Sequence, residues 1–337
     1  MSATGEQKPR VLVTGGAGYI GSHAVHALLD RGYPVSVVDN LVTGFRWAVP
    51  DRARFHEVDV ADQARMEAIL REDEIGGIMH FAGSVVVPES VENPLKYYRN
   101  NTAASRNLLE AAVAADIPHF IFSSTAATYG LAEVVPVTED APQRPINPYG
   151  ASKLMTETML RDAAAAQPFN FCALRYFNVA GADPEGRTGQ STAGATHLIK
   201  VACEAALGKR SHVAVFGTDY DTPDGTGVRD YIHVSDLVEA HVLALEWLRA
   251  HASQSLFMNA GYKRGFSVLE VLDSVERVSG RPIERRLESR RAGDPGELVS
   301  DNARIVRTLG WSPRYADLDM IVRHALSWEE ALEARRS

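Results

Sequence analysis

Short apolar runs alternate with longer stretches of helical spacing along the first half of the chain. Runs such as Val11, Leu12 and Val13 have the length and the β-branched composition of buried strands. Between the runs, apolar residues recur every three or four positions, as in an amphipathic helix. The pattern predicts strands at 10–15, 34–39, 54–59, 76–82, 118–124 and 170–176, and helices at about 18–31, 62–72, 93–115 and 148–166. Such alternation predicts an α/β fold with a doubly wound parallel sheet covered by helices on both faces.

This rhythm ends near Gly181, where residues 182–191 are rich in turn formers. Helical patterns return at about 194–208, 235–250, 267–279 and 302–309, and an irregular loop is expected at 219–227. We therefore expect residues 182–337 to form mainly a second, smaller α/β lobe, with a segment near 229–250 returning to the first domain. The sequence shows no internal repeat or low-complexity segment, which excludes a repeat array.

Three glycines lie at the boundary between the first predicted strand and the first predicted helix. Gly15, Gly18 and Gly21 belong to the string Thr14-Gly-Gly-Ala-Gly-Tyr-Ile-Gly-Ser22. Glycines keep side chains away from such a turn, so that backbone N–H groups at the helix N-terminus can approach a pyrophosphate. Tyr19 and Ile20 belong to the same candidate site. The pattern predicts a dinucleotide-binding domain over residues 10–181, behind a polar tail of residues 1–9.

The second predicted strand ends in Asp39, which is followed by Asn40. A carboxylate at this distance from the glycines accepts hydrogen bonds from the adenosine ribose and repels a 2′-phosphate, so NAD is expected rather than NADP. Ligands of such sheets bind at the carboxyl ends of the strands, where small or polar residues leave room for a flat cofactor. The other candidate cofactor-binding residues are Asp59, Val60, Phe81, Ala82, Gly83, Asn101, Ser123 and Tyr176.

Tyr149 and Lys153 are four residues apart in a predicted helix. This spacing is about one helical turn, so both side chains project from the same face. A cation beside a phenol favours the phenolate and lowers the pKa of the phenol. Tyr149 is therefore a candidate base for the oxidation of an alcohol near neutral pH. Such a pair is common on solvated helix faces, and the dinucleotide signature upstream is the feature that favours catalysis here.

Composition is that of an ordinary globular enzyme, with 337 residues, 45% hydrophobic and 23% charged, and a formal charge of -8. The chain has no Lys/Arg-rich run, so neither nucleic acid nor an anionic membrane is expected as a partner. Cys172 and Cys203 lack metal-ligand spacing, and we expect reduced core cysteines and no metal. Neither a signal peptide nor a membrane-spanning run is visible, which favours a cytoplasmic location.

Several further strings, in this order along the chain, resemble the extended short-chain dehydrogenase/reductase superfamily and, within it, the UDP-glucose 4-epimerase family. Besides the glycine turn and Asp39-Asn40, they are His80-Phe-Ala-Gly83, Pro88-Glu-Ser90, Phe122-Ser-Ser-Thr125, Tyr149-x-x-x-Lys153, Arg175-Tyr-Phe-Asn178, Val228-Arg-Asp-Tyr-Ile-His-Val234 and Arg291-Ala-Gly-Asp294. The resemblance extends from Thr14 to about Trp311. It implies a Rossmann-type first domain and a smaller lobe that binds the substrate.

The resemblance implies an enzyme that interconverts UDP-glucose and UDP-galactose with a tightly held NAD. Tyr149 would take the proton of the sugar 4-hydroxyl while a hydride leaves C4. The resulting 4-keto sugar would turn over in the site before the hydride returns to its opposite face. Lys153 would also bind the nicotinamide ribose. Thr125 would be the third catalytic residue, with its hydroxyl beside the sugar 4-oxygen, where many family members carry Ser.

The resemblance also implies a UDP site. Arg229 and Arg291 match the family's pyrophosphate-binding arginines, and a guanidinium can bind phosphate oxygens in a bidentate manner. Phe216 matches an aromatic residue near the uracil, and Asp294 would reach the uridine ribose. The remaining substrate-binding residues by this match are Asn178, His197 and Leu198.

Three places depart from the family pattern. Ser84 and Val85 stand where many members carry a lysine near the cofactor phosphates, so one phosphate contact is missing or replaced. His197 replaces a common asparagine and adds a titratable group. Leu298 stands at the position that controls access of larger sugars, where bulk tends to exclude an N-acetyl group. Leu is intermediate in size, so the acceptance of UDP-GlcNAc stays open.

Neighbouring activities differ in the residues next to the catalytic threonine. The sugar 4,6-dehydratases of the superfamily have an Asp-Glu pair directly after it, whereas Thr125 is followed here by Ala126 and Ala127, which disfavours dehydration. Three alternatives stay open: a 4-epimerase of UDP-GlcNAc, a 4-epimerase of UDP-xylose or UDP-arabinose, and, less favoured, a UDP-glucuronate decarboxylase. A protein that only senses NAD has no use for a tyrosine base, and this alternative is disfavoured.

The helices predicted near 93–115 and 148–166 carry more small and apolar residues than one face of a sheet needs. These residues are Ala103, Leu108, Ala111, Ala112, Ala151, Met155 and Met159. The family pairs the equivalent helices between subunits. A homodimer is therefore expected.

Overall fold

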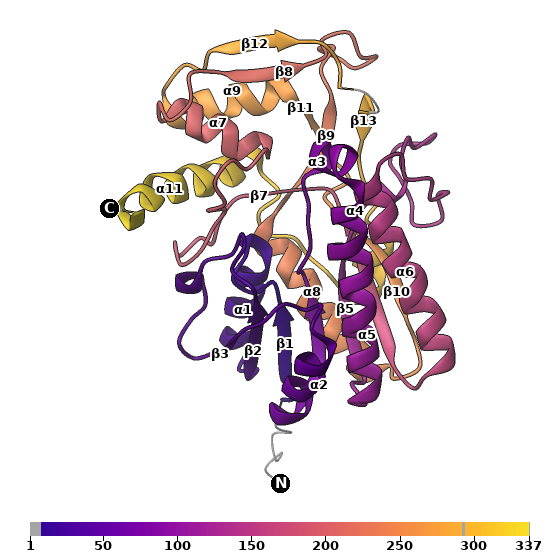
Figure 1. Ribbon diagram of the computed structural model, residues 1–337. Helices are drawn as coiled ribbons and strands as arrows, with labels where there is room; N and C mark the ends of the chain where they lie inside the picture. The colour runs from indigo at the N-terminus through magenta and orange to yellow at the C-terminus, as the bar shows by residue number, and fades with distance from the viewer. Residues whose placement is uncertain (1–7, 292–293, 337) are drawn as a thin grey trace.

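The computed structural model describes residues 8–291 and 294–336, without the side chains of residues 333–336. Residues 1–7 of the predicted polar tail lie outside the described residues. The same holds for residues 292 and 293, which belong to one of the strings that carry the family resemblance. In Figure 1 the described chain forms a larger layered domain with a smaller lobe above it.

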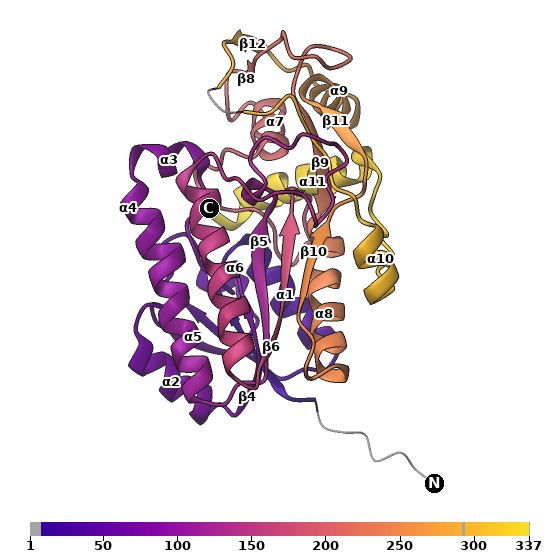
Figure 2. The same cartoon turned by 90° about the vertical axis from the view of Figure 1, so that its right-hand side faces the viewer.

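A seven-stranded parallel sheet forms the centre of the larger domain (Figure 2). In spatial order its strands are β10 (Leu256–Ala260), β6 (Asn170–Tyr176), β5 (His119–Thr125), β4 (Ile75–His80), β1 (Arg10–Thr14), β2 (Val35–Asp39) and β3 (Arg54–Glu57). The doubly wound α/β prediction is confirmed, and the first six strands in the sequence lie within two residues of their predicted bounds. The sequence pattern missed β10, because this short strand contains no β-branched residue.

Helices cover both faces of this sheet (Figure 2). On one face lie α2 (Gln63–Glu72), α4 (Pro94–Tyr97), α5 (Ala104–Ala114) and α6 (Pro148–Ala166), and on the other lie α1 (Tyr19–Asp30) and α8 (Val234–Ala250). Val11 and Val13 belong to the core under α1 and α8, whereas Leu12 belongs to the core under α2 and α5. Successive residues of a strand face opposite sides, so a strand buried on both sides must be apolar throughout.

The helix predicted near 93–115 is not uniform. Between α4 and α5 the chain makes a wide turn of π-helix, η2 (Tyr98–Ala103), and a short helix, α3 (Val87–Glu92), precedes α4. π-helical turns are often found at functional sites. This turn directs the side chain of Asn101 towards Ser84 and Ser152, which lie beside the cofactor and tyrosine residues predicted from the sequence.

In the described residues, the smaller lobe contains two small sheets and three helices. One sheet consists of β7 (Asn178–Ala180), β9 (Val228–His233), β11 (Gly265–Ser267) and β13 (Glu297–Leu298), and the other of β8 (Val213–Phe216) and β12 (Arg285–Glu288). The helices α7 (Leu198–Ala206), α9 (Val268–Ser279) and α11 (Leu318–Arg336) share one apolar core with these strands. The sequence pattern missed most of these strands because two to four residues are too few to show a period, and it missed β9 because Arg229 and Asp230 interrupt its apolar residues. It also missed α3 and α11.

The predicted helices at 235–250, 267–279 and 302–309 agree closely with α8, α9 and α10 (Ala303–Leu309). The helix predicted at 194–208 begins only at Leu198, because Gly194 has a φ of +68° and His197 is extended. In the predicted return segment, α8 packs against β5 and β6 of the large sheet, whereas β9 pairs with strands of the small sheet. After α8 the chain adds β10 to the edge of the large sheet.

Two properties of the described residues are relevant to function. Within 8–291 and 294–336, no helix has both the length and the apolar character needed to cross a membrane. In the same residues, no group of three or more His, Cys, Asp or Glu side chains is arranged to hold a metal ion.

Candidate active site

Tyr149 lies in the first turn of α6 and faces the carboxyl end of β5. The Asn147 side chain caps this helix and accepts a hydrogen bond from the Gly150 N–H at 2.8 Å. A Cβ atom at Gly150 would lie only 2.5 Å from the Ala127 carbonyl oxygen. Glycine at this position therefore lets α6 approach the end of β5 more closely than a residue with a side chain would. This approach places the Tyr149 phenol beside the Thr125 side chain, which acts on the pKa of the phenol through hydrogen bonding.

Burial raises the pKa of Tyr149, and the hydrogen bond with Thr125 opposes this shift. The sequence predicted a pKa lowered by Lys153, and the structure corrects this. The Lys153 ammonium is directed at the Ser123 carbonyl oxygen, with a distance of 3.0 Å, and lies over the Phe122 ring. Burial lowers the pKa of Lys153 itself to about 8. Thr125, rather than Lys153, therefore favours the phenolate in this arrangement.

Two further tyrosines surround these residues. The ring of Tyr97 meets that of Tyr149 edge-on, with centroids 6.4 Å apart. The Tyr97 hydroxyl turns away and donates to the Val86 carbonyl oxygen at 2.5 Å. Tyr176, at the end of β6, forms a hydrogen bond with the Ser123 hydroxyl. The structure thus brings Ser123, Thr125, Tyr149, Lys153 and Tyr176 together, as the sequence predicted, and adds Tyr97, for which the sequence carried no signal.

The glycine turn between β1 and α1 is tightly packed. Gly15 has a φ of +70°, and a Cβ atom there would lie 2.7 Å from the Ala82 N. A Cβ atom at Gly21 would lie 2.1 Å from the Gly15 carbonyl oxygen. The helix starts at Gly18 without a side-chain cap and has no acidic residue in its first turn. Its N–H groups and the positive end of its dipole are therefore open to an anion.

Asp39 lies at the end of β2, next to this turn. Its carboxylate accepts hydrogen bonds from the Ala17 N–H at 3.0 Å and the Leu41 N–H at 2.8 Å. Burial raises the pKa of Asp39, and these two bonds oppose the shift. Each carboxylate oxygen can accept a further bond, for example from a ribose hydroxyl. Asn40 donates to Asp59 at 3.0 Å, so the structure brings these predicted residues together at the ends of β2 and β3.

The remaining candidate cofactor residues support these groups. Tyr19 donates to the Gly181 carbonyl oxygen at 2.7 Å, Ile20 and Phe81 pack against one apolar core, and Val60 lies in the other. The side-chain oxygen of Asn101 accepts a hydrogen bond from the Ser84 N–H at 2.7 Å. Its side-chain nitrogen donates to the Ser84 carbonyl oxygen and to the Ser152 hydroxyl, both at 3.0 Å. Asn101 therefore holds the turn after Gly83 against α6, and its amide has partners within the chain.

Taken together, these residues fit a dinucleotide. A glycine turn without space for side chains faces an uncapped helix N-terminus, and a carboxylate with free acceptor capacity lies at the end of the next strand. Lys153 and the glycine turn lie at the carboxyl edge of the same sheet. A cofactor that lies across this edge would connect the two.

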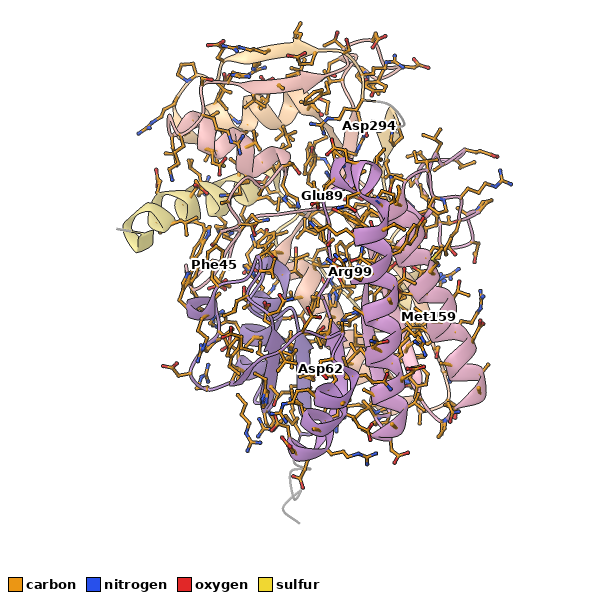
Figure 3. All side chains as sticks on the ribbon, viewed as in Figure 1. Phe45, Asp62, Glu89, Arg99, Met159 and Asp294 are labelled. Carbon is orange, nitrogen blue, oxygen red and sulfur yellow. The ribbon has the colours of Figure 1, made fainter. Side chains whose placement is uncertain are left out.

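The predicted pyrophosphate arginines lie in the smaller lobe. Arg229, on β9, donates to the Asp294 carboxylate at 2.5 Å and to the Pro295 carbonyl oxygen at 2.8 Å. The Arg291 guanidinium lies 3.7 Å from the centre of the Phe216 ring. Figure 3 shows Asp294 at the edge of the smaller lobe that faces α3. Four of the predicted nucleotide residues therefore form two contacting pairs, Arg229 with Asp294 and Arg291 with Phe216.

His197 and Leu198 begin α7. His197 lines a small cavity together with Tyr19, Gly181 and Gln190, and its Nδ1 lies 3.4 Å from the Gln190 side-chain nitrogen. Desolvation in this cavity and then Lys200 lower the pKa of His197. The structure thus brings His197 to the start of the dinucleotide helix.

Asn178 begins β7 immediately after β6. It pairs with Tyr231 of β9, two residues from Arg229. Asn178 is therefore placed where the large sheet passes into the small one, between the tyrosine and arginine residues.

Comparison with known proteins agrees with this geometry. The model of the NAD dependent epimerase/dehydratase family matches residues 11–261. The chain belongs to this family. The resemblance and the Rossmann-type fold expected from the sequence are confirmed, and the expectation of NAD agrees with the family's cofactor.

Three relatives of this family member illustrate the similarity. A UDP-glucose 4-epimerase of Azospirillum brasilense is 59% identical over 325 residues, which cover 96% of this chain and 93% of the relative. A UDP-glucose 4-epimerase structure from Stenotrophomonas maltophila, with bound NAD and formylated UDP-arabinopyranose, is 39% identical with a TM-score of 0.94, covering 98% of this chain and 100% of that one. The UDP-Glc/GlcNAc 4-epimerase of Campylobacter jejuni is 46% identical with a TM-score of 0.84, covering 96% and 99%.

Three positions that bear on the family pattern, Ser84, Val85 and Leu298, have defined contacts or exposure in the structure. The Ser84 hydroxyl accepts a hydrogen bond from Asn100 at 3.1 Å, and Val85 is exposed. Leu298 packs against an apolar cluster that contains Ala126 and Tyr129. An uncharged side chain thus stands where the family pattern implies a lysine, and the aliphatic side chain of Leu298 lies next to the end of β5.

Glu157 was not among the residues predicted from the sequence, although it is buried on α6 one turn after Lys153. Its spacing from Tyr149 and Lys153 on one helix face was the available signal. Through its side chain, Glu157 connects α6 with β5.

Proposed function

We propose that the chain is a UDP-glucose 4-epimerase, which interconverts UDP-glucose and UDP-galactose with a resident NAD. The observation that carries this proposal is the placement of the buried Tyr149 and Thr125 side chains, where α6 packs on the end of β5, at the same sheet edge as the glycine turn. The A. brasilense relative, at 59% identity, carries this name, and the S. maltophila structure holds both NAD and a UDP-sugar.

The glycine turn, Asp39 and Lys153 would hold NAD, which would supply a hydride acceptor for sugar C4 and, once reduced, a hydride donor to the opposite face of the same carbon. Tyr149 removes the proton of the 4-hydroxyl, and the Thr125 hydroxyl holds the 4-oxygen in line with the phenol. After the 4-keto sugar has turned over, Tyr149 returns the proton. A general base of this kind typically contributes about 10² to 10⁴ in rate.

Burial opposes ionisation of Tyr149, so the surrounding groups must stabilise its phenolate. Thr125 does so by its hydrogen bond. The Lys153 ammonium is instead anchored at the Ser123 carbonyl oxygen, which holds it at the strand end. There it binds the nicotinamide ribose. Thr125 thus makes an otherwise unfavourable base usable.

The UDP group binds through residues that now bind each other. Arg229 and Arg291 take the pyrophosphate oxygens, and Phe216 offers its ring to the uracil. Asp294 accepts from the uridine ribose, while Asn178, His197 and Leu198 complete the site. Binding therefore replaces the Arg229–Asp294 and Arg291–Phe216 contacts by contacts to the nucleotide.

The two parts of the fold bind different ligands. Residues 10–181, with the return segment near 229–250, hold the cofactor at Gly15, Gly18, Gly21 and Asp39. Residues 182–337 mainly hold the UDP-sugar. The missing lysine near Val85 reduces the number of phosphate contacts, so the glycine turn and Asp39 bear a larger share of cofactor binding.

The oligomer is a homodimer formed by the helices near 93–115 and 148–166. Leu108, Ala111 and Ala112, which the sequence predicted for this surface, instead pack in the core under α5. The apolar groove left on the outside is lined by Tyr98, Thr102, Ala103, Arg106, Met155 and Met159, and Figure 3 shows Met159 on this helical side. Light scattering should give a dimer at micromolar concentration, and a monomer would contradict it.

The location of this enzyme is the cytoplasm.

A product assay by NMR tests the proposed function. The purified chain is incubated, without added cofactor, with UDP-Glc, UDP-Gal, UDP-GlcNAc, UDP-Xyl and UDP-GlcA in separate reactions. UDP-Glc and UDP-Gal should interconvert. Conversion of UDP-GlcNAc as well would show that Leu298 admits an N-acetyl group, and would agree with the two substrates in the name of the C. jejuni relative. Release of CO₂ from UDP-GlcA alone would favour a decarboxylase, and no conversion at all would favour a sensor.

A further inference from the structure

Glu157 is a buried carboxylate whose partners all lie within the chain. Its Oε1 accepts from the Ser124 hydroxyl at 2.5 Å and from Arg175 Nε at 2.9 Å. Its Oε2 accepts from Arg175 Nη2 at 2.7 Å and from the Gln143 amide at 2.9 Å. Glu157 and Ser124 are 2% and 0% exposed, and the four hydrogen bonds to the Glu157 carboxylate all come from side chains of this chain. The proposed reaction uses none of these groups.

The contacts continue into neighbouring elements. Arg175 donates to the Tyr129 hydroxyl at 3.0 Å and to the Glu139 carbonyl oxygen at 3.2 Å. Tyr129 in turn donates to Asn259 on β10 at 2.7 Å. β6 and the segment around residues 129–143 thus hold Glu157 from several sides, and these hydrogen bonds fix the position of its carboxylate.

Three consecutive residues of β5 each bind α6. The Ser123 carbonyl accepts from Lys153, the Ser124 hydroxyl donates to Glu157, and the Thr125 side chain bonds Tyr149. The first and third of these contacts involve residues of the proposed chemistry. The contact between Ser124 and Glu157 lies between these two and involves no reacting group. Its partner on α6 is a carboxylate that other side chains hold in place.

We propose that the hydrogen bond from Ser124 to Glu157 sets the position of Thr125 relative to Tyr149. Ser124 and Glu157 are positioning residues that act through Thr125. The inference rests on the proposed function, because it concerns the proton transfer at Tyr149. Displacing a catalytic group by about 1 Å can cost about 10² in rate, so a partly loosened strand end should cost about tenfold.

The chain contains a matched control for this contact. The Ser36 hydroxyl, on β2, donates to the Asp73 carboxylate at 2.5 Å, and Ser36 is likewise 0% exposed. Asp73 also accepts from Arg54 and His56, both at 2.8 Å. Ser36 lies near the amino end of its strand, away from the strand ends that carry the site. The two serines therefore differ in place, while their local chemistry is alike.

The test compares Ser124→Ala and Ser36→Ala with the wild-type enzyme as purified. Thermal unfolding and the pH dependence of kcat and KM for UDP-galactose are measured for all three. Both variants should lose similar stability, since each leaves a buried carboxylate with one donor fewer. Ser124→Ala alone should lower kcat about tenfold at nearly unchanged KM. In the Ser124→Ala variant, the rise of kcat with pH should also occur at higher pH. The reason is that a displaced Thr125 no longer opposes the effect of burial on the pKa of Tyr149.

Two results would overturn the inference while leaving the proposed function intact. One is a Ser124→Ala variant whose kcat and pH profile match those of Ser36→Ala. The other is a loss confined to KM. A wild-type enzyme that does not interconvert UDP-galactose and UDP-glucose would instead overturn the proposed function, and the inference with it.

Discussion

The tyrosine end and the arginine end of the site are organised in different ways. At the tyrosine end, Tyr149, Lys153 and Thr125 are at most 8% exposed, and β5 and α6 hold them through direct contacts. At the arginine end, Arg291 is exposed and lies on Phe216, while Arg229 is paired with Asp294. The first region is already arranged for chemistry, whereas the second must exchange its internal contacts for the nucleotide. Turnover and affinity should therefore respond to separate substitutions.

The largest effect is expected from Tyr149→Phe. Removal of the base should lower kcat by about 10² to 10⁴. UDP affinity, measured by calorimetry, should stay within about twofold, because the arginine end is untouched. Tyr97→Phe is the control, since its ring meets Tyr149 while its hydroxyl points elsewhere. A Tyr149→Phe variant with near-normal turnover would remove this residue from the mechanism.

A smaller effect on turnover is expected from Thr125→Ala. The loss of one hydrogen bond to a developing charge should lower kcat by about 10- to 100-fold. Without this bond, burial alone governs the pKa of Tyr149, so the rising limb of kcat should move to higher pH. Thr125→Ser keeps the hydroxyl and should retain the wild-type pH profile. Unshifted profiles in both variants would show that Thr125 does not bond the phenolate.

The smallest of these effects concerns affinity alone. Arg291→Met should weaken UDP binding about tenfold, the value of one charge-assisted hydrogen bond, with kcat unchanged at saturation. Arg290→Met is a close control, because Arg290 also lies over an aromatic ring, that of Tyr220, at 4.2 Å. Its effect should stay within about twofold. Equal losses in the two variants would indicate a general contribution of positive charge rather than a specific phosphate contact.

Both regions also show what the sequence could predict. Strands β1, β2, β4, β5 and β6 are buried on two faces, so their apolar runs, together with the glycine turn and Asp39, were visible in the sequence, whereas β3 is a partly exposed edge strand. The short strands of the smaller lobe were not, because a strand such as Glu297–Leu298 is too short to show any period. Its pairing with β9 depends on tertiary contacts.

The sign of the Tyr149 pKa shift could not be predicted from spacing. Tyr149 and Lys153 do share a helix face, as expected, but the ammonium bonds the Ser123 carbonyl and burial dominates the phenol. The contact of Ser124 with Glu157 was hidden for a similar reason. Both residues are visible in the sequence, and only the packing of α6 on β5 determines which side chains meet.

The central claim is that the enzyme removes a hydride from C4 and returns it to the same carbon. UDP-galactose labelled with deuterium at sugar C4 tests this directly, with purified protein and no added NAD. We expect UDP-glucose that retains the deuterium at C4, with none released to the solvent. Product without deuterium at C4, or conversion that depends on added NAD in stoichiometric amount, would contradict the claim.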